Sequence, residues 1–326
     1  MHKSLYTPLF AAAVFLPTFS TAPVLADDVI ITPIGQKTGE FCRADRAMIF
    51  EDPDGTRVLY DPGRTVAGGA DPRLGTIEIM LLSGVHSDHI GVGRTTQNPD
   101  DPDGTCGGNP PLADTPNSNF AEIVAATGAK VFAGGEMRDY LRTKVVAEGG
   151  TAAQVDVLRH GGKRTLGGVT VAVVTAHHSN GVPRDILHPA LAASLAADGL
   201  TAYVGPENGF VLTFSNGLVV YLSGDTGHTA DMGAIVRDYY GASVVVVNMG
   251  DIFSMGPEEA AFAVNKLLKP KTAIPSHANQ ESTVDGLVVA GTRLETFSDL
   301  VSNSIDVIVP LSGVPITCDG AGFCIQ

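Results

Sequence analysis

Short apolar runs rich in β-branched residues recur along the chain, and turn-forming residues separate them. A continuous apolar run of a few residues between turn signals is typical of a buried strand. Two pairs of runs flank tight turns that end in Gly55 and Gly217, which is a hairpin pattern because glycine tolerates positive φ. The pattern predicts strands at residues 47–50, 57–60, 76–82, 130–133, 168–174, 209–214, 218–222, 243–247 and 271–274.

Two segments between these strands are predicted to be helical. Residues 119–126 begin with a polar N-cap and stop at Gly128, and residues 257–268 begin with Pro257, which suits a first helical turn. Each half of the chain passes from hairpins to strand–helix units. This order predicts an α/β fold in which two central mixed β-sheets pack together with helices on the outside.

Two long connections interrupt this alternation. Residues 91–118 are rich in Pro, Gly, Asp and Asn, and they begin directly after a histidine cluster, so we expect them to cover it. Residues 180–208 are partly rich in Ala and Leu, with a short helix expected near residues 191–197. Loops of this length are commonly functional or disordered. Neither has the character of an interdomain linker, so one domain is expected.

The N-terminus has the pattern of a secretory signal peptide. Lys3 provides a positive start, a short apolar stretch follows, and small or apolar residues lead to Ala26. We expect a signal peptide at residues 1–26, a single mature domain at residues 27–326, and a periplasmic or secreted location. An uncleaved membrane anchor is the alternative, although two prolines interrupt the apolar stretch. No other stretch is long and apolar enough to span a membrane, so no membrane contact is expected after cleavage.

The charge of the chain bears on its partners. The formal net charge is −14 at pH 7. A phosphate backbone repels such an acidic protein, so nucleic acid is not expected to be a partner. The acidity also favours solubility, which is its simpler explanation. The expected partner is a small-molecule substrate, and the oligomeric state is not readable from the sequence.

Four cysteines remain in the expected mature chain, and disulfides persist in exported proteins. Three pairings are possible. Proximity along the sequence favours Cys42 with Cys106 and Cys318 with Cys324. None of the four has C-x-x-C spacing, so a cysteine zinc site is not expected.

Metal-ligating residue types stand at the ends of four predicted strands. His86, Asp88 and His89 follow the strand at residues 76–82 within a tight loop. Imidazoles and carboxylates bind divalent cations when they converge from different directions. A lone histidine is more often structural, but repetition at strand ends favours one shared site. The later members of the set are His177, His178, Asp225 and His277.

These motifs resemble the metallo-β-lactamase superfamily, whose signature is His-x-His-x-Asp-His on the loop after a strand. More narrowly, the chain is similar to the UlaG-like and UPF0173 metal-dependent hydrolases. The similarity runs from about Asp28 to about Ser282, and it implies the αββα sandwich of that superfamily. The supporting segments are Tyr60-Asp61-Pro62, Gly224-Asp225-Thr226-Gly227, residues 250–260 and Ile274-Pro275-Ser276-His277.

The resemblance implies two metal positions. The first would be held by His86 and by one imidazole of the adjacent pair His177 and His178. The branch pattern selects His178, and His177 is the reserve choice. Asp225 would bridge the first metal ion to the second.

The second implied position takes Asp88, His89 and His277. Asp88 would also orient the attacking water, which makes it the candidate catalytic residue. Zinc is the default ion, in one or two copies, because histidine and aspartate ligands suit it, and iron, manganese or nickel are alternatives. Such ions lower the pKa of a bound water to near neutrality.

Position 84 departs from the signature, since Gly84 stands where the first histidine belongs. The first position could be empty, another residue could substitute, or hydrolysis could have been lost. His228 is the first candidate to substitute, with His177 second, although His228 could equally be a solvated turn residue. Asp251 also matches the branch, either as the partner of a ligand histidine or as an acid at a helix N-terminus.

The expected function is that of a secreted hydrolase that directs a metal-activated water at a small-molecule ester, lactone, amide or phosphodiester. The alternative is a degenerate member that binds metal or ligand without turnover, motivated by Gly84. A β-lactamase proper is disfavoured, because the signature lacks its first histidine and the flanking segments resemble the UlaG-like branch.

Overall fold

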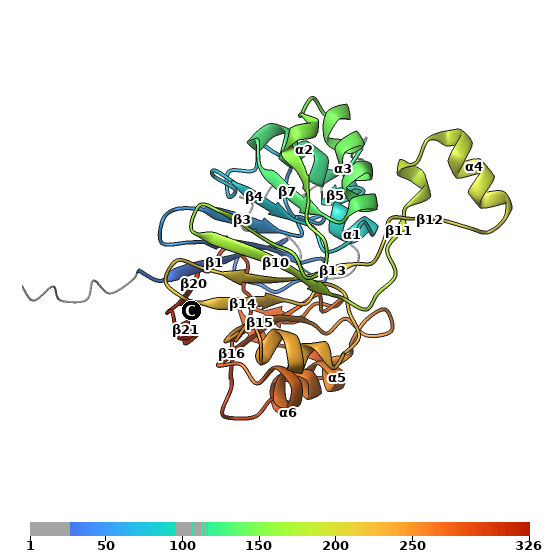
Figure 1. Ribbon diagram of the computed structural model, residues 1–326. Helices are drawn as coiled ribbons and strands as arrows, with labels where there is room; N and C mark the ends of the chain where they lie inside the picture. The colour runs from blue at the N-terminus through green and yellow to red at the C-terminus, as the bar shows by residue number, and fades with distance from the viewer. Residues whose placement is uncertain (1–26, 96–105, 107–111, 114, 116) are drawn as a thin grey trace, which may run out of the picture.

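The computed structural model describes residues 27–95, 106, 112–113, 115 and 117–326, and the expected signal peptide lies outside them. Two stacked β-sheets form the centre of the molecule, and helices cover both outer faces (Figure 1). The αββα sandwich implied by the resemblance is confirmed.

The first sheet has the strand order β21-β20-β1-β2-β3-β4-β7-β8. The predicted hairpin is present, with Met48 opposite Tyr60. From β3 to β8 neighbouring strands are parallel, so the segments that follow β3 and β4 leave the sheet at the same edge. The strands are β1 (Val29–Ile34), β2 (Ala47–Glu51), β3 (Arg57–Tyr60), β4 (Ile79–Leu81), β7 (Lys130–Ala133), β8 (Val155–Val157), β20 (Ile316–Cys318) and β21 (Cys324–Ile325).

The second sheet has the order β19-β16-β15-β14-β13-β10-β9. β13 is antiparallel to both β10 and β14, so those two strands point the same way, and β15, β16 and β19 continue parallel to β14. The carboxyl ends of β10, β14 and β16 therefore meet at one edge, together with the amino end of β13. The strands are β9 (Lys163–Leu166), β10 (Val169–Thr175), β13 (Asn208–Thr213), β14 (Val219–Leu222), β15 (Val244–Asn248), β16 (Thr272–Ser276) and β19 (Asp306–Val307).

α2 begins and ends at the local capping residues that the sequence predicts. Ser118 caps α2 through its Oγ, which accepts a hydrogen bond from the Ala121 N–H, and Gly128 ends the helix at φ 78°. The α-helices are α1 (Ser87–Ile90), α2 (Asn119–Thr127), α3 (Gly135–Ala147), α4 (Pro189–Ala197), α5 (Pro257–Phe262) and α6 (Arg293–Leu300). Short 3₁₀ turns are η1 (Ala152–Gln154) and η2 (Arg184–Ile186), and π-helical segments are η3 (Met232–Arg237) and η4 (Ala263–Leu268).

Three apolar layers hold the sandwich together. The inner layer lies between the sheets, where Phe50 of β2 packs near Phe214, just after β13. Phe120 belongs to the layer under α2 and α3, and Phe297 belongs to the layer under η3, α5 and α6. The apolar runs are thus buried on both faces of each sheet, which explains why they lack strict alternation.

Several element boundaries differ from the sequence prediction. The strand expected at residues 76–82 is limited to Ile79–Leu81, and the helix expected at residues 257–268 changes from α to π after Phe262. The helix expected near residues 191–197 is α4, which stands away from the sandwich on an arm formed by β11 (Gly181–Val182) and β12 (Ala202–Tyr203) (Figure 1). No residue of α4 is buried.

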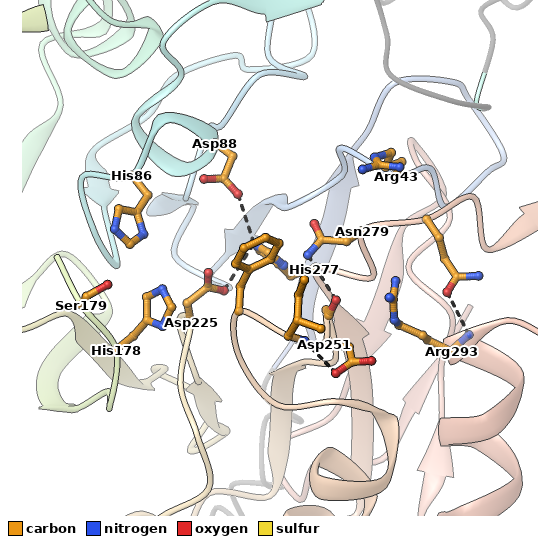
Figure 2. Close-up of a pocket in the computed structure, with 14 residues that line it drawn as sticks. Arg43, His86, Asp88, His178, Ser179, Asp225, Asp251, His277, Asn279 and Arg293 are labelled. Atoms are coloured by element: carbon orange, nitrogen blue, oxygen red, sulfur yellow. Dashed lines mark hydrogen bonds and ion pairs between the residues drawn. The ribbon is translucent and has the colours of Figure 1, made fainter. Parts of the chain in front are cut away.

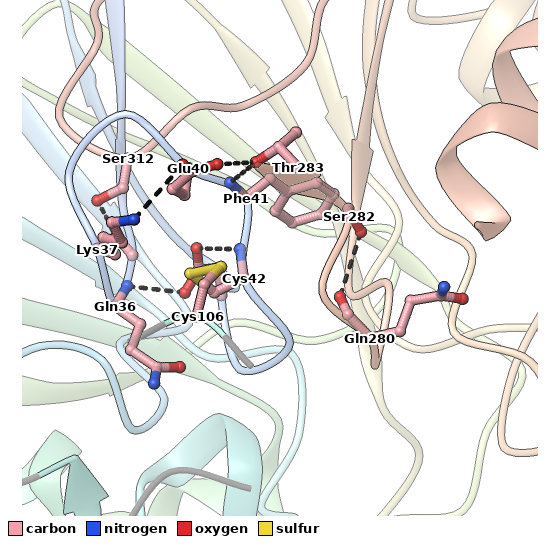
Figure 3. The surroundings of a disulfide bond; sticks show 12 residues. Gln36, Lys37, Glu40, Phe41, Cys42, Cys106, Gln280, Ser282, Thr283 and Ser312 are labelled. Carbon is pink, nitrogen blue, oxygen red and sulfur yellow. Dashed lines mark hydrogen bonds and ion pairs between the residues drawn. A yellow bond between two sulfur atoms is a disulfide. The ribbon is translucent and has the colours of Figure 1, made fainter. Parts of the chain in front are cut away.

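Two short strand pairs and two disulfides complete the described structure. Most of the long loop expected at residues 91–118 lies outside the described residues, but β5 (Arg94–Thr95) pairs with β6 (Leu112–Ala113), and β17 (Thr283–Val284) pairs with β18 (Leu287–Val288). The preferred cysteine pairing is confirmed: Cys42 is bonded to Cys106 (Figure 3), and Cys318 is bonded to Cys324. Among the described residues, no helix is long and apolar enough to cross a membrane.

Candidate metal centre

One edge of the sandwich collects the predicted ligands, because the strands that precede them end there. His86, which is the N-cap of α1, and α1 itself follow β4, and three loops follow β10, β14 and β16. Figure 2 shows His86, Asp88, His178, Asp225 and His277 facing one another around a cleft. The structure therefore brings together every residue that the sequence analysis assigned to the two metal positions.

Asp88, His89 and His277 form the first of two ligand clusters, and their ligand atoms lie within 4.8 Å of one another. His277 Nε2 lies 3.3 Å from Asp88 Oδ2 and 3.4 Å from Asp225 Oδ1. His89 Nε2 lies 3.3 Å from Asp225 Oδ2, and the two imidazole rings are stacked. Asp225 thus touches both imidazoles from one side.

The orientation of His89 is set by buried neighbours. Asp61 Oδ2 lies 2.8 Å from His89 Nδ1 and accepts a hydrogen bond from the Ser83 hydroxyl. This contact fixes the ring so that Nε2 points at the cluster, as the partner of a ligand histidine does. Asp61 directly follows Tyr60, the last residue of β3, and it belongs to one of the segments that carry the resemblance.

Arg46 orients Asp88 in a similar way. Its guanidinium donates a hydrogen bond to Asp88 Oδ2 and another, of 3.1 Å, to Asn279 Oδ1. Arg46 is buried, and the Asp88 side chain keeps 30% of its surface exposed to the cleft. Asp88 is therefore held in place while one of its faces remains accessible.

His86, His178 and Glu207 form the second cluster, and their ligand atoms also lie within 4.8 Å of one another. The His86 and His178 rings meet edge to face with centroids 5.1 Å apart. Glu207 Oε1 lies 3.5 Å from His86 Nδ1. Glu207 directly precedes β13, so it enters the site from the antiparallel strand that begins where β10 and β14 end.

Charge is concentrated at this edge. Burial alone would raise the pKa of Asp88, but Arg46 and His89 hold that pKa well below its usual range. Burial alone would lower the pKa of His89, yet Asp225 and Asp61 raise it well above its usual range. Burial raises the pKa of Glu207 to about 9. Asp88 and Asp225, which both lie within 3.4 Å of His277 Nε2, have lowered pKa values and are ionised at neutral pH, and two such carboxylates favour a cation beside them.

The donor atoms fit a divalent metal ion. Among the described residues, His89 Nε2, Asp225 Oδ1 and both carboxylate oxygens of Glu207 are buried at the site without a hydrogen-bond partner. Buried polar atoms are rarely left unpaired, because each costs free energy that a ligand recovers. Imidazole nitrogens and carboxylate oxygens together suit zinc, iron, manganese or nickel.

A cleft of about 770 Å³ is lined by His86, Asp88, His178, Asp225 and His277, whereas the side chains of His89 and Glu207 are buried. Arg43 and Arg293 lie on the side of this cleft opposite His86 and His178 (Figure 2). Leu112, from the described part of the loop at residues 91–118, lines an adjoining cavity that also reaches Asp88. The expected proximity of that loop to the site holds for this residue.

Comparison with known proteins agrees with this geometry. A family model described as a beta-lactamase superfamily domain matches residues 45–277. The chain belongs to the metallo-β-lactamase superfamily. A UPF0173 metal-dependent hydrolase of Methylobacterium nodulans is 30% identical over 269 residues, which cover 80% of this chain and 92% of the relative. One from Herpetosiphon aurantiacus is 29% identical over 235 residues, which cover 71% of this chain and 78% of the relative. These similarities place the chain in the UPF0173 branch.

A solved structure supports the metallo-β-lactamase fold independently. Igni18, a novel metallo hydrolase from the archaeon Ignicoccus hospitalis, aligns with a TM-score of 0.58 at 20% identity and covers 89% of this chain and 99% of its own. At this identity the similarity shows the fold.

The structure distinguishes the adjacent histidines that the superfamily signature left open. His178 lines the cleft, whereas the His177 side chain is exposed and its backbone N–H donates to Thr226 Oγ1. His228 is exposed and packs edge to face against Phe262. Neither His177 nor His228 belongs to a described ligand cluster, so neither replaces the histidine missing at position 84.

The loop after β15 contributes to the site through its backbone. A Cβ at Gly250 would lie 2.8 Å from His277 Nδ1 and 2.7 Å from His277 O, so only glycine allows this approach. Asp251 lines the cleft, and its carboxylate accepts a hydrogen bond from the Ile252 N–H. That hydrogen bond shapes the loop, and no contact with a ligand histidine accompanies it among the described hydrogen bonds.

Three site residues were missed as such by the sequence analysis: Asp61, Arg46 and Glu207. Asp61 was marked by its place at a strand end beside an apolar run. Arg46 and Glu207 precede strands rather than follow them, so a search of strand ends does not reach them. Glu207 is detectable only once β13 is known to run antiparallel to its neighbours.

Proposed function

We propose that this protein is a metal-dependent hydrolase that directs an activated water at an ester, lactone, amide or phosphodiester of a small molecule. The supporting observation is that two ligand clusters converge at one open cleft, which His86, His178, Asp88 and His277 line. Zinc is the proposed ion, because four imidazoles and three carboxylates offer nitrogen and oxygen ligands.

Metal ions bound at such a site lower the pKa of water and polarise the bond that breaks. The chain itself supplies orientation. Asp88 is ionised at neutral pH because Arg46 and His89 lower its pKa against the effect of burial, and its exposed face is turned to the cleft. It can accept a hydrogen bond from the attacking water and align that water with the substrate. Asp61 holds the His89 ring in the orientation that turns Nε2 toward the ligand cluster.

The cleft suggests a substrate that carries negative charge. Arg43 and Arg293 line its far side, and the Arg293 guanidinium is positioned by a 3.0 Å hydrogen bond to Ala278 O. Two guanidinium groups opposite the reacting centre suit a carboxylate or phosphate group of a small molecule. The overall charge of −14 disfavours larger polyanions.

We also propose that the protein is exported with residues 1–26 removed. Two disulfides in a chain without free cysteines among the described residues support an oxidising compartment. N-terminal sequencing of protein recovered from the periplasm or medium should begin at Asp27. Recovery only from the cytoplasm with an intact N-terminus would contradict export.

The catalytic proposal is tested on purified protein that is stripped by a chelator and reloaded with zinc, manganese, iron or nickel. Nitrophenyl esters, lactones and phosphodiesters, each with and without an added carboxylate, form the substrate panel. We expect hydrolysis that depends on metal, that favours the anionic member of each pair, and that His277→Ala abolishes. His188→Ala is the matched control, because His188 is exposed on the α4 arm. Metal-independent activity equal in all three proteins would refute the proposal.

A second candidate is a member that binds metal or ligand without turnover, and Gly84 is the observation behind it. Metal binding with no reaction across the panel, and with His86→Ala changing ligand affinity alone, would favour this candidate. A chromogenic cephalosporin in the same panel tests β-lactamase activity, which we do not expect.

A further inference from the structure

We propose that Glu207 replaces the histidine missing at position 84 and completes the first metal position with His86 and His178. The inference rests on the proposed metal-dependent function, but its test reads metal binding rather than turnover. It changes the chemistry of that position from three imidazoles to two imidazoles and a carboxylate.

Glu207 occupies the space beside Gly84. A Cβ built on Gly84 would lie 2.1 Å from Glu207 Oε1 and 2.6 Å from Glu207 Cδ, well inside van der Waals contact. The Glu207 carboxylate therefore occupies the volume that any side chain at position 84 would enter. A histidine at position 84 and the observed Glu207 exclude each other, which is the relation expected of one ligand that replaces another.

The distances between these side chains suit one bound ion. Ligands about 2.1 Å from one tetrahedral ion lie about 3.4 Å from each other. Glu207 Oε1 lies 3.5 Å from His86 Nδ1, and the His178 ring stands edge to face with that of His86. The three side chains are thus spaced to share one cation, with Asp225 available as a further ligand on the side of the other cluster.

Glu207 is buried without a hydrogen-bonding partner for its carboxylate among the described residues. The Glu207 side chain is fully buried, and neither carboxylate oxygen has a hydrogen-bond partner among the described residues. An isolated buried carboxylate is costly, and a bound cation removes that cost. A purely structural glutamate would be expected to show a buried arginine or a set of N–H donors.

The backbone around Glu207 is held in place for this role. The Asn208 N–H donates to Ser83 O at 2.8 Å, which ties the start of β13 to the residue before Gly84. His160 Nε2 lies 3.0 Å from Glu207 O. Both contacts hold the peptide group between Glu207 and Asn208, so the carboxylate is directed at His86 from a fixed backbone.

The test compares full-length mature protein with Glu207→Gln, which keeps the shape and removes the charge. Zinc per chain is measured by mass spectrometry after dialysis, affinity by chelator competition, and ligand geometry by the visible spectrum of the cobalt-loaded protein. We expect Glu207→Gln to lose about one metal equivalent or to bind it at least tenfold more weakly, with a changed cobalt spectrum. Glu148→Gln is the matched control, since Glu148 lies at the far end of α3.

A second variant keeps the proposal testable if Glu207→Gln folds poorly. Gly84→His combined with Glu207→Gly exchanges the ligand back to the histidine of the superfamily signature, and it should regain the metal equivalent with a more nitrogen-rich cobalt spectrum. Unchanged stoichiometry, affinity and spectrum in Glu207→Gln would overturn the proposal. Intact metal binding that depends on Glu207 but supports no hydrolysis would instead count against the proposed function alone.

Discussion

The Cys42–Cys106 disulfide is expected to stabilise the fold more than the Cys318–Cys324 disulfide does. The first joins residues 64 apart in the sequence, and the second joins residues 6 apart. The perturbation is Cys42→Ser with Cys106→Ser, so that no lone thiol is left. The matched comparison is Cys318→Ser with Cys324→Ser.

The magnitude follows from the entropy of the unfolded chain. A cross-link that closes the longer loop removes unfolded conformations worth about 4 kcal/mol at 25 °C, and the shorter loop about 2 kcal/mol. Three of the four cysteines are under 6% exposed and Cys324 is 8% exposed, so the packing lost with each pair is similar. The expected difference between the two variants is therefore about 2 kcal/mol.

The longer disulfide also supports the site. Cys42 precedes Arg43 of the cleft, and its N–H donates a 2.8 Å hydrogen bond to Asp45 beside Arg46 (Figure 3). Loss of the cross-link should loosen this segment and raise KM for anionic substrates more than it lowers kcat.

The assay is urea unfolding of both metal-free variants, with thiols counted in denaturant before and after reduction. We expect no free thiols before reduction and four afterwards in the wild type. The reasoning would be refuted if the Cys318/Cys324 variant lost more stability than the Cys42/Cys106 variant, or if thiols were free before reduction.

Three further predictions concern the groups that support the metal centre. Asp61→Asn should weaken metal affinity by about 10–100-fold, because His89 loses the carboxylate that orients it; chelator competition measures this, and unchanged affinity would contradict it. Arg46→Met should slow turnover by about 10–100-fold, because Asp88 loses a charged hydrogen bond worth about 1.5–3 kcal/mol; kcat that stays at the wild-type value would remove Arg46 from the site. Burial raises the pKa of Asp45 from 3.8 to about 6. Between these two pH values the folded state keeps a proton that the unfolded chain releases. The contribution of Asp45 to stability therefore falls as the pH rises from 3.8 to about 6. Asp45→Asn should remove about 3 kcal/mol of that pH dependence. Urea unfolding of the variant and the wild type at pH 4 and pH 7 measures the change in stability, and an identical pH dependence in both proteins would rule the effect out.

Much of the sandwich could be predicted from local patterns. The strands at residues 57–60 and 130–133 appear with the predicted bounds, because their apolar runs are bounded by turn residues and buried on both faces. The helix at Asn119–Thr127 was predictable because Ser118 and Gly128 cap it through contacts within one turn. The change from α to π geometry after Phe262 carries no local signal, and this segment packs against η3.

The residues of the candidate site also fall into those that local sequence predicts and those that only the fold brings in. His86, Asp88, His89, Asp225 and His277 were predictable from sequence because each follows a strand, and strands that point the same way deliver such residues to one edge. Their convergence is the outcome of that single topological rule. A side chain that joins these ligands from another direction, as Glu207 does, does not follow a strand, so the rule does not reach it.

The resemblance already preferred His178 to His177, but only the tertiary structure shows that His178 lines the cleft while the His177 side chain is exposed. Only it placed Glu207 beside Gly84, since 123 positions of chain separate them and the antiparallel β13 brings them together. The sequence alone determined that metal ligands gather at the ends of these strands and that one is missing at position 84. The fold determined what fills the gap, because only packing shows which side chain occupies the volume that a glycine leaves free.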